Sequence, residues 1–545
     1  MCNLNLLEKI EKIGKYYNKI GLLVVFREEI KMMKEPKTLR LILGDQLNYE
    51  HSWFQEVNEN HTYVLFEVRS ETDYVAHHIQ KVAGFFASMR AFSAHLISQG
   101  HTVRYYKISE TTHFSTFEAG IKELIATENF DRFEYQEPDE YRVDAHLKSL
   151  VESISIPWEV YSSEHFYTER DTLEKIFEGK KTYLMETFYR QIRKKEMILM
   201  DGDKPVTGQW NYDGDNRKKL PKNHVVSAPF LFENDVTDIY EEIQTAGIKT
   251  IGNIDAKRFI WPVNRNQALE LLDAFIENCL PFFGTFEDAM TTQSWSVYHS
   301  RLSFSMNLKI LSPKEVIEKV IQAWESRQNE ITYNQVEGFV RQIVGWREFM
   351  RGIYWAKMPE FATLNFLNHS NPLPNWFWTG ETKMKCLQSS INQSLDYAYA
   401  HHIQRLMITG NFALLAGVNP DELDQWYLGI YIDALDWVEI TNTRGMSQFA
   451  DGGIIGTKPY VSSATYIDKM SNYCENCFYS KKEKIGEKAC PFNSLYWHFY
   501  ERHENKLGKN PRIGMMYNVW NKMEISKKEA ILVQAQYYLD NINSL

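Results

Sequence analysis

Four cysteines in the C-terminal third of the chain have the spacing of a metal site. Cys474 and Cys477 form a Cys-x-x-Cys pair, Cys490 follows shortly after, and Cys386 lies 88 positions before Cys474. Such a pair presents two thiolates on one turn, and two further thiolates complete a four-sulfur set for zinc or for a [4Fe–4S] cluster. Because only one pair is compact, the spacing favours neither group, and unrelated buried thiols are a third interpretation.

The adjacent histidines His401 and His402 lie in a stretch that predicts a helix. Neighbouring side chains on a helix point about 100° apart, so only one of the two is expected to face a given pocket. A histidine in a pocket can donate a proton near neutral pH. The competing interpretation is a histidine held in the core by its hydrogen bonds.

Segment 433–442 concentrates hydrogen-bonding side chains where a helix is expected to end, namely Asp433, Asp436, Glu439 and Asn442. Carboxylates accept hydrogen bonds and an amide both donates and accepts, so this set suits the polar edge of a heterocyclic ring. Acidic residues of an exposed loop have the same appearance in a sequence, and the segment alone does not decide between the two interpretations.

Three aromatic residues, Trp378, Trp426 and Tyr427, can relay single electrons to a redox cofactor. Packing accounts for most tryptophans in helical domains, so this role depends on its context. The chain carries neither a Gly-x-Gly-x-x-Gly sequence after a strand nor a phosphate loop with Gly-Lys-Ser/Thr.

The elements that must position these residues fall into two patterns. In the first, strand and helix signals alternate, and a buried strand at 39–43 ends at Gly44-Asp45-Gln46. Further strands are expected over 63–68, 103–107, 133–135 and 158–161, and helices over 77–98, 114–126 and 143–154. This alternation predicts a doubly wound α/β domain over residues 37–165, with any ligand bound beyond the strand ends near Asp45.

Helical periodicity dominates the second pattern. Residues 166–240 form a polar, basic stretch rich in glycine and proline, which predicts an interdomain linker. An all-α domain is expected over 241–545, with helices over 267–278, 313–326, 336–355, 388–409 and 421–435. Residues 1–36 precede the first clear strand and are interpreted as an N-terminal extension.

Composition limits the classes of protein. A net charge of −10 argues against non-specific coating of nucleic acid, yet the stretches 190–222 and 481–528 run against it, with nine and eleven Lys/Arg and five Asp/Glu each. No apolar run approaches the roughly 20 residues of a membrane span.

Six cysteines in a chain this large do not form a disulfide framework, which favours a reducing cytoplasm as the compartment. Cys2 and Cys279 are interpreted as bystanders that take no part in the metal site.

Several strings occur together in one order, and with these motifs the chain resembles the prokaryotic iron–sulfur photolyases and cryptochromes over roughly residues 37 to 525. The strings are Leu43-Gly-Asp-Gln-Leu47, Gly208-Gln-Trp-Asn-Tyr-Asp213, Glu337-Gly-Phe-Val-Arg-Gln342, Gly345-Trp-Arg-Glu-Phe349, His401-His-Ile-Gln-Arg-Leu-Met407, Asn442-Thr-Arg-Gly-Met446 and Lys458-Pro-Tyr460. The resemblance implies an α/β antenna domain, a long linker and an all-helical FAD-binding domain. It also implies that the four cysteines hold a [4Fe–4S] cluster rather than zinc.

By resemblance, several residues are expected at the FAD: Ser300 and Ser303 at its phosphates, Gln342 and Arg347 on the flavin-contacting helix, and Asp433, Asp436 and Asn442 beside the isoalloxazine ring. Trp426 and Trp378 match the photoreduction path, with Tyr427 as an additional step. The contacts to an antenna chromophore, 6,7-dimethyl-8-ribityllumazine, are matched by Asp45, Gln46 and Glu71. Asp215 resembles a residue that favours repair assisted by a divalent metal such as Mg²⁺.

The resemblance also implies a reaction. His402 resembles the histidine that faces a (6-4) pyrimidine–pyrimidone lesion, Tyr460 lines the same pocket, and His401 is the less favoured partner. The expected activity is light-driven repair of this photoproduct in UV-damaged DNA, by electron transfer from photoexcited reduced FAD with His402 as proton donor. A blue-light cryptochrome photoreceptor with little or no repair is the alternative. No protein partner is implied, and nothing demands more than a monomer.

Overall fold

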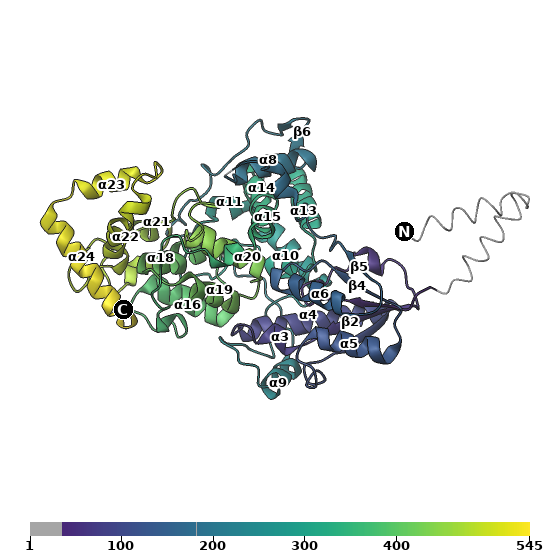
Figure 1. The fold of residues 1–545 in the computed structure, drawn as a ribbon. Helices are drawn as coiled ribbons and strands as arrows, with labels where there is room; N and C mark the ends of the chain where they lie inside the picture. The colour runs from purple at the N-terminus through teal and green to yellow at the C-terminus, as the bar shows by residue number, and fades with distance from the viewer. Residues whose placement is uncertain (1–34, 181) are drawn as a thin grey trace, which may run out of the picture.

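A computed structural model describes residues 35–180 and 182–545 of the chain. The predicted extension at 1–36 therefore lies almost entirely outside the described residues, as does Cys2. A parallel sheet with its helices forms one end of the molecule, and the C-terminal helices form the opposite end (Figure 1). Within the described residues, no helix is long and apolar enough to cross a membrane.

The N-terminal domain is a five-stranded parallel sheet in the order β3-β2-β1-β4-β5. Its strands are β1 (Thr38–Leu41), β2 (His61–Phe66), β3 (Thr102–Tyr106), β4 (Arg132–Gln136) and β5 (Trp158–Tyr161), and its helices are α3 (Arg69–Thr72), α4 (Ile79–Ser98), α5 (Phe117–Glu128) and α6 (Tyr141–Ser153), with a 3-10 turn η1 (Ser52–Phe54). Every neighbouring pair is parallel. The predicted doubly wound α/β domain is thereby confirmed.

The two faces of this sheet are buried in different cores because successive strand residues point to opposite sides. Leu39, Leu41 and Val64 pack with residues of α5 and α6 in one apolar cluster. Ile42 and Leu65 face the other way, into the large cluster that continues through α4 into the helical part of the chain. The sheet is therefore anchored to the helical domain through one face only.

The stretch predicted as a linker contains regular elements. These are α7 (Thr172–Ile176), α8 (Met185–Lys195) and a short antiparallel pair, β6 (Met200–Asp201) with β7 (Lys204–Pro205). Helix α8 carries the buried residues Phe188 and Ile192, and it packs on the π-helical turn η3 described below. Residues 206–236 contain no helix, and α9 (Thr237–Thr245) follows.

The rest of the chain is helical, with bounds that follow in chain order. The first half comprises α10 (Arg265–Asn278), η2 (Leu280–Phe282), α11 (Phe283–Phe286), α12 (Ser303–Asn307), α13 (Pro313–Ser326), α14 (Tyr333–Val340), η3 (Arg341–Arg347), α15 (Glu348–Lys357), η4 (Glu360–Thr363), η5 (Asn375–Phe377) and α16 (Lys385–Tyr397). The second half comprises α17 (His402–Gln404), η6 (Arg405–Gly410), α18 (Asn411–Ala416), α19 (Pro420–Ile430), α20 (Asp436–Ile440), η7 (Thr441–Ser447), α21 (Ala464–Met470), η8 (Tyr473–Asn476), α22 (Pro491–Leu507), α23 (Gly514–Asn521), α24 (Ile525–Asp540) and η9 (Ile542–Ser544).

Two helix predictions were wrong in extent. The helix expected over 388–409 breaks at Ala398, whose φ of 51° is left-handed, so His401 is the N-cap and His402 the first residue of a new helix. The helix expected over 421–435 ends at Ile430, and Asp436 begins α20. Apolar periodicity continues across both breaks because the flanking segments bury side chains in the same core, and the pattern therefore hides the turn.

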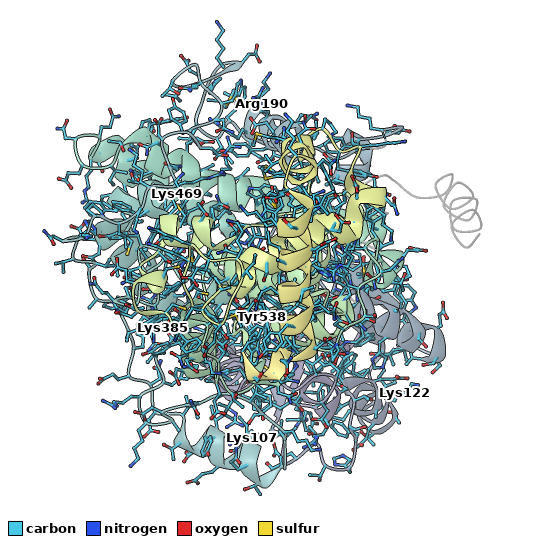
Figure 2. The ribbon with its side chains drawn as sticks, turned by 90° about the vertical axis from the view of Figure 1, so that its left-hand side faces the viewer. Lys107, Lys122, Arg190, Lys385, Lys469 and Tyr538 are labelled. Atoms are coloured by element: carbon cyan, nitrogen blue, oxygen red, sulfur yellow. The ribbon has the colours of Figure 1, made fainter. Side chains whose placement is uncertain are left out.

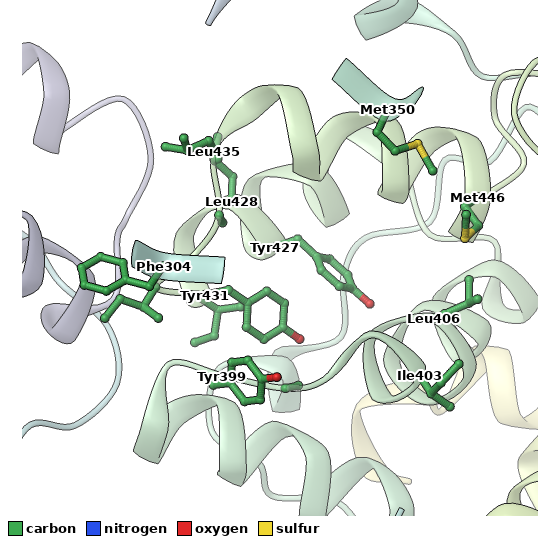
Figure 3. Close-up of a cluster of buried hydrophobic side chains, with 14 of the residues drawn as sticks. Phe304, Met350, Tyr399, Ile403, Leu406, Tyr427, Leu428, Tyr431, Leu435 and Met446 are labelled. Carbon is green, nitrogen blue, oxygen red and sulfur yellow. The ribbon is translucent and has the colours of Figure 1, made fainter. Parts of the chain in front are cut away.

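Three helical runs widen into π-helical turns, η3, η6 and η7. Such turns are rare and occur frequently at functional sites. Turns η6 and η7 pack against each other. Figure 3 shows the buried core beside them, where Tyr399, Tyr427 and Tyr431 lie between Phe304 and the segment that carries Leu406.

Candidate functional site

A cavity opens where the sheet meets the helical domain, near the carboxyl ends of the first two strands. It has an empty volume of about 910 Å³, its open mouth included, and Leu435 lines it from the helical domain. Five carboxylates line it, Asp45, Glu67, Glu71, Asp139 and Glu140, together with the basic residues His77 and Lys81. Lys309 partly balances the carboxylates, because its Nζ lies 2.6 Å from Asp139 Oδ2. Burial raises the pKa of Asp45 to about 6.

The three residues predicted for this site have different places. Asp45 and Glu71 line the cavity, and Arg142 donates to both Glu71 carboxylate oxygens at 3.0 and 2.7 Å. Gln46 is fully buried and is not among the lining residues; its Nε2 donates to the backbone oxygens of Gln136 and Glu137 at 3.2 and 3.3 Å. It therefore braces the loop that presents Asp45.

Sequence reasoning missed Lys81 and Glu140 in this cavity. Lys81 is buried on α4, and its Nζ donates to the Leu428 carbonyl oxygen at 2.8 Å. Burial lowers its pKa to about 8. A lysine within the apolar part of helix 77–98 was the available signal, since buried charges are usually paired or functional.

In the helical domain, Asp433 is the centre of a buried polar network. It accepts hydrogen bonds from Ser303 Oγ at 2.6 Å and from Arg405 Nη2 at 2.8 Å, and its backbone oxygen accepts from Asn307 Nδ2 at 2.7 Å. The other arm of the Arg405 guanidinium donates to Glu439 at 2.8 Å. Two predicted residues, Ser303 and Asp433, are thus joined across 130 positions of sequence, whereas Asn307 and Arg405 were not predicted.

Arg347, on the π-helical turn η3, presents a partly unsatisfied guanidinium to the same region. Its Nη2 lies 3.1 Å from His165 Nε2, and within the described part of the chain its Nε and Nη1 have no hydrogen-bond partner. Its guanidinium lies over the Trp437 ring, 5.0 Å from the centroid. Burial lowers its pKa to about 10. A buried donor without a partner costs about 1–3 kcal/mol, so these nitrogens suit an anionic or carbonyl-bearing ligand. Gln342 lies half-buried on the same turn.

Asp436 joins the helical domain to the sheet-edge cavity. Its Oδ2 accepts a hydrogen bond from the Tyr354 hydroxyl at 2.5 Å, and its backbone N–H donates to Glu140 Oε1 at 2.9 Å. Glu140 lines the cavity. The start of α20 is therefore fixed by a side chain of the α/β domain.

Asn442 and Ser300 are bonded within their own segments. Asn442 lies on η7 and donates from Nδ2 to the Val438 carbonyl oxygen at 2.7 Å. Ser300 precedes α12, and its Oγ accepts from the Leu302 N–H at 3.4 Å. Both lie on elements that carry or adjoin the Asp433 network, without a direct hydrogen bond to Asp433 in the described residues.

The two histidines have different surroundings, because His401 is the N-cap and His402 the first residue of α17. His401 is 2% exposed, and its ring stacks on that of His299, with centroids 4.4 Å apart and planes 14° apart. The next side chain, His402, is exposed to solvent. The protein around it and the Arg405 guanidinium nevertheless lower the pKa of His402 to about 4. His402 is thus the accessible member of the pair and His401 the supporting one.

Tyr460 and Asp215 lie apart from these networks. Tyr460 is half-buried, and burial raises its pKa while the linker residue Arg217 opposes this rise. Asp215 is exposed, and its N–H donates to the Tyr212 carbonyl oxygen at 2.9 Å. In residues 35–180 and 182–545, no three His, Cys, Asp or Glu side chains are grouped so that they could hold a metal ion.

The predicted electron path begins in the core and ends at the surface. Trp426 is fully buried, packs edge-on against Tyr427 at 5.3 Å, and donates from Nε1 to the Phe377 carbonyl oxygen at 3.1 Å. The Tyr427 hydroxyl donates to the Arg405 carbonyl oxygen at 2.7 Å. Trp378 directly follows Phe377 and is 43% exposed. The three residues therefore extend from beside Arg405 to the protein surface.

The four predicted cysteines surround one small cavity, lined by Cys386, Cys474, Cys477 and Cys490 with mainly apolar and aromatic neighbours. Cys386 and Cys490 are buried, and Cys279 is not part of the lining. Burial raises the pKa of the Cys386 thiol, and the three other cysteines act on it in the same direction. The tertiary structure thus brings the Cys474–Cys490 segment and α16 to the same small cavity.

Comparisons with known proteins agree with this arrangement. Residues 40–259 match the family described as "Deoxyribodipyrimidine photo-lyase-related protein". The chain is 39% identical over 511 residues to a (6-4) photolyase of Agrobacterium fabrum, an alignment that covers 93% of this chain and 99% of that protein.

Two solved structures share the fold. A bacterial class III photolyase from Agrobacterium tumefaciens has a TM-score of 0.55 at 14% identity, covering 93% of this chain and 98% of that one. A cryptochrome of Synechocystis sp. PCC6803 has a TM-score of 0.53 at 11% identity, covering 92% and 100%. With its parallel-sheet domain, its helical domain and its full-length relative, the chain belongs to the (6-4) photolyase family within the photolyases and cryptochromes.

Proposed function

We propose that the protein repairs (6-4) photoproducts in UV-damaged DNA in a light-driven reaction. The observation that carries this proposal is the exposed His402 at the start of α17, directly beside the buried Arg405–Asp433 network. A proton donor for an extruded base must be accessible, whereas groups that hold a cofactor are buried and hydrogen-bonded. Full-length similarity to a (6-4) photolyase supports the same reaction.

The helical site fits FAD, because the unpartnered nitrogens of Arg347 and the Asp433–Ser303 pair are buried polar groups of the kinds that hold its ring and phosphates. Gln342, Asp436, Asn442 and Ser300 complete the proposed set. Bound FAD, when reduced and excited by light, would supply the electron for repair. The protein's own part is to orient the ring through Arg405 and Asp433 and to hold a proton at His402.

Proton donation by His402 needs its acidic form. With a pKa of about 4, the imidazole is mostly neutral at pH 7 in the free protein. A lesion brings DNA phosphates close to this ring, and their negative charge favours the imidazolium. We therefore propose that DNA binding itself prepares His402 as the proton donor, with Tyr460 lining the lesion pocket.

The cysteine cavity suits a [4Fe–4S] cluster by its residue types, because four cysteines line it and four thiolates are the ligand set of such clusters, although in the described residues their side chains are not grouped as metal ligands. Its proposed role is structural. The sheet-edge cavity suits a polar heterocycle such as 6,7-dimethyl-8-ribityllumazine, because Asp45 and Glu71 offer hydrogen-bond acceptors among apolar lining residues. The lone, exposed Asp215 does not fit a protein-held Mg²⁺, and no step involves one.

The basic segment 481–528 and the linker are the proposed contacts to DNA phosphates. Figure 2 views the molecule from the C-terminal end, where helices of this segment lie in front. We place the protein in the cytoplasm, since cysteine thiols persist in a reducing compartment. We also propose that it acts as a monomer.

One assay tests the proposal. The reduced, illuminated protein is given an oligonucleotide with one (6-4) lesion, or one with a cyclobutane dimer, and restored bases are measured. Turnover of the (6-4) substrate alone is expected. Normal flavin photoreduction without turnover on either substrate would favour the photoreceptor function instead.

The metal group is tested separately by iron, sulfide and zinc analysis of the wild type and of Cys386→Ala, with Cys279→Ala as the control. We expect iron and sulfide in the wild type and in the control, and their loss in Cys386→Ala. Stoichiometric zinc would exclude the cluster.

A further inference from the structure

We infer that Gln404 is a positioning residue that connects the cysteine site to the catalytic histidines. The inference rests on the proposed function, since it explains how the histidine pair is held for repair. Gln404 lies three residues after His401 in the histidine motif and is 1% exposed. Because it is buried, its amide must find its partners within the protein.

Every polar atom of the Gln404 side chain is bonded. Its Nε2 donates to the Tyr473 hydroxyl at 3.0 Å and to Gln393 Oε1 at 2.9 Å. Its Oε1 accepts from the His401 N–H at 3.2 Å and from Gln393 Nε2 at 2.9 Å. The amide therefore has one bond to the histidine turn and three to the supports behind it.

Both supports belong to elements that carry cysteines. Tyr473 directly precedes Cys474 and lines the cysteine cavity. Gln393 lies on α16, whose second residue is Cys386. Two elements that each carry a cysteine, far apart in sequence, thus meet at one glutamine.

On the other side, the same turn is held by a stacked ring. His401 packs flat on His299, and His299 Nε2 hydrogen-bonds to the Glu287 carbonyl oxygen at 3.0 Å. His401 is thereby held at its backbone by Gln404 and at its ring by His299. The first residue of α17, His402, takes its direction from this anchored turn, because the left-handed Ala398 leaves it without a continuous preceding helix.

Through these contacts the cysteine site would also position the histidine turn, in addition to stabilising the fold. Catalysis is sensitive to misplacement, and a shift of about 1 Å can cost about a hundredfold in rate. A metal group bound by Cys386 and Cys474 would hold α16 and Tyr473 at a constant separation, and with them the amide of Gln404. Gln404 then serves repair by keeping the turn of the proton donor in place.

The test removes one hydroxyl. Tyr473→Phe deletes the partner of Gln404 while keeping the ring that lines the cavity. Tyr479→Phe is the matched control, because Tyr479 lines the same cavity and is not among the bonded partners of Gln404 in the described residues. Iron content and flavin photoreduction are measured for both variants, together with the rate and pH profile of (6-4) repair.

We expect Tyr473→Phe to lower the repair rate about three- to tenfold, the usual worth of one hydrogen bond, and to shift its pH profile. Iron content and photoreduction should stay at the wild-type level, and Tyr479→Phe should repair normally. Equal repair and identical pH profiles in Tyr473→Phe and the wild type would overturn the inference. An equal loss in both variants would also overturn it, because the cavity and not the amide would then be responsible.

A second readout separates this inference from the proposed function. In protein labelled with ¹⁵N-histidine, the signals of His401 and His402 should move in Tyr473→Phe and stay in place in Tyr479→Phe. This outcome does not depend on turnover, so it supports the positioning role even if the wild type repairs no lesion. Unmoved histidine signals would reject it, whatever the repair assay gives.

Discussion

The sheet-edge cavity and the histidine site are built in opposite ways. The cavity is an open space at the end of a parallel sheet, lined by five carboxylates and almost entirely by residues of one domain. The histidine site is a closed network in which Ser303, Arg405 and Asp433 already bind one another. The first suits a replaceable accessory ligand, whereas the second suits a cofactor whose surroundings must not move.

The cavity is joined to the helical domain by the hydrogen bond from the Asp436 N–H to Glu140 and by that from Lys81 to the Leu428 carbonyl oxygen. The electrostatics of the cavity and of the histidine site differ. In the cavity, burial raises the pKa of Asp45 to about 6. In the histidine site, burial lowers the pKa of His299 to about 4, and the surrounding protein with the Arg405 guanidinium lowers the pKa of the exposed His402 to about 4. We therefore expect substitutions in the histidine site to alter the chemistry of repair. Substitutions in the sheet-edge cavity should alter only the capture of light.

The largest expected effect separates the sites most sharply. His402→Ala should lower (6-4) repair by roughly 10²- to 10⁴-fold, the usual contribution of a general acid, and leave flavin photoreduction unchanged. The measurement is repair per absorbed photon beside the photoreduction rate. His113→Ala, at an exposed position in the α/β domain, is the control. Full repair by His402→Ala would remove this residue from its role.

Trp426→Phe should reduce flavin photoreduction to a small fraction of its rate, because phenylalanine is much harder to oxidise than tryptophan. Repair by protein that is already chemically reduced should persist. Transient absorption after a light pulse measures the first effect, and Trp520→Phe, another fully buried tryptophan, is the control. An unchanged photoreduction rate would mean that another path supplies the electron.

The third expected effect, smaller than the two above, is the dependence of the repair rate on pH. Because the pKa of His402 is lowered, its acidic form becomes scarcer as pH rises, by about tenfold per unit above the pKa. Repair under constant illumination should therefore fall from about pH 6 to about pH 9, less steeply where DNA phosphates raise the pKa. His402→Asn should lose this dependence together with most activity. A rate that rises with pH in the wild type would contradict the role of an acid.

The smallest effect belongs to the cavity. Glu71→Gln should weaken binding of the lumazine chromophore about two- to tenfold, because it removes a charge-assisted partner from the lining. Repair per photon absorbed by the flavin itself should not change. Chromophore titration measures the first effect, and Glu123→Gln, outside the cavity, serves as the comparison. If Glu71→Gln also lowered repair per photon absorbed by the flavin, the cavity and the histidine site would be coupled, and the bond between Glu140 and Asp436 would be the first candidate for that coupling.

Much of the architecture could be predicted from the sequence. The five strands and the helices around them follow from alternating patterns, and helix α13 has its expected bounds because Ser312 caps it, accepting from the Glu315 N–H, and Pro313 occupies its first turn. The cysteine group was also predictable as a set. Gln46 was expected to contact the antenna chromophore, but its side chain bonds to backbone oxygens. A sequence shows that a polar residue follows a strand, but it does not show whether the side chain faces a ligand or the backbone.

The order of the elements, the separation into an α/β and a helical domain, and the residue types available for chemistry all follow from the amino-acid sequence. Which of these residues meet depends on how distant segments pack. Periodicity records that a side chain is buried, but it carries no information about its partner. Ser303 with Asp433, Asp436 with Glu140, and Gln404 with Tyr473 are pairs that become neighbours only when distant segments pack together.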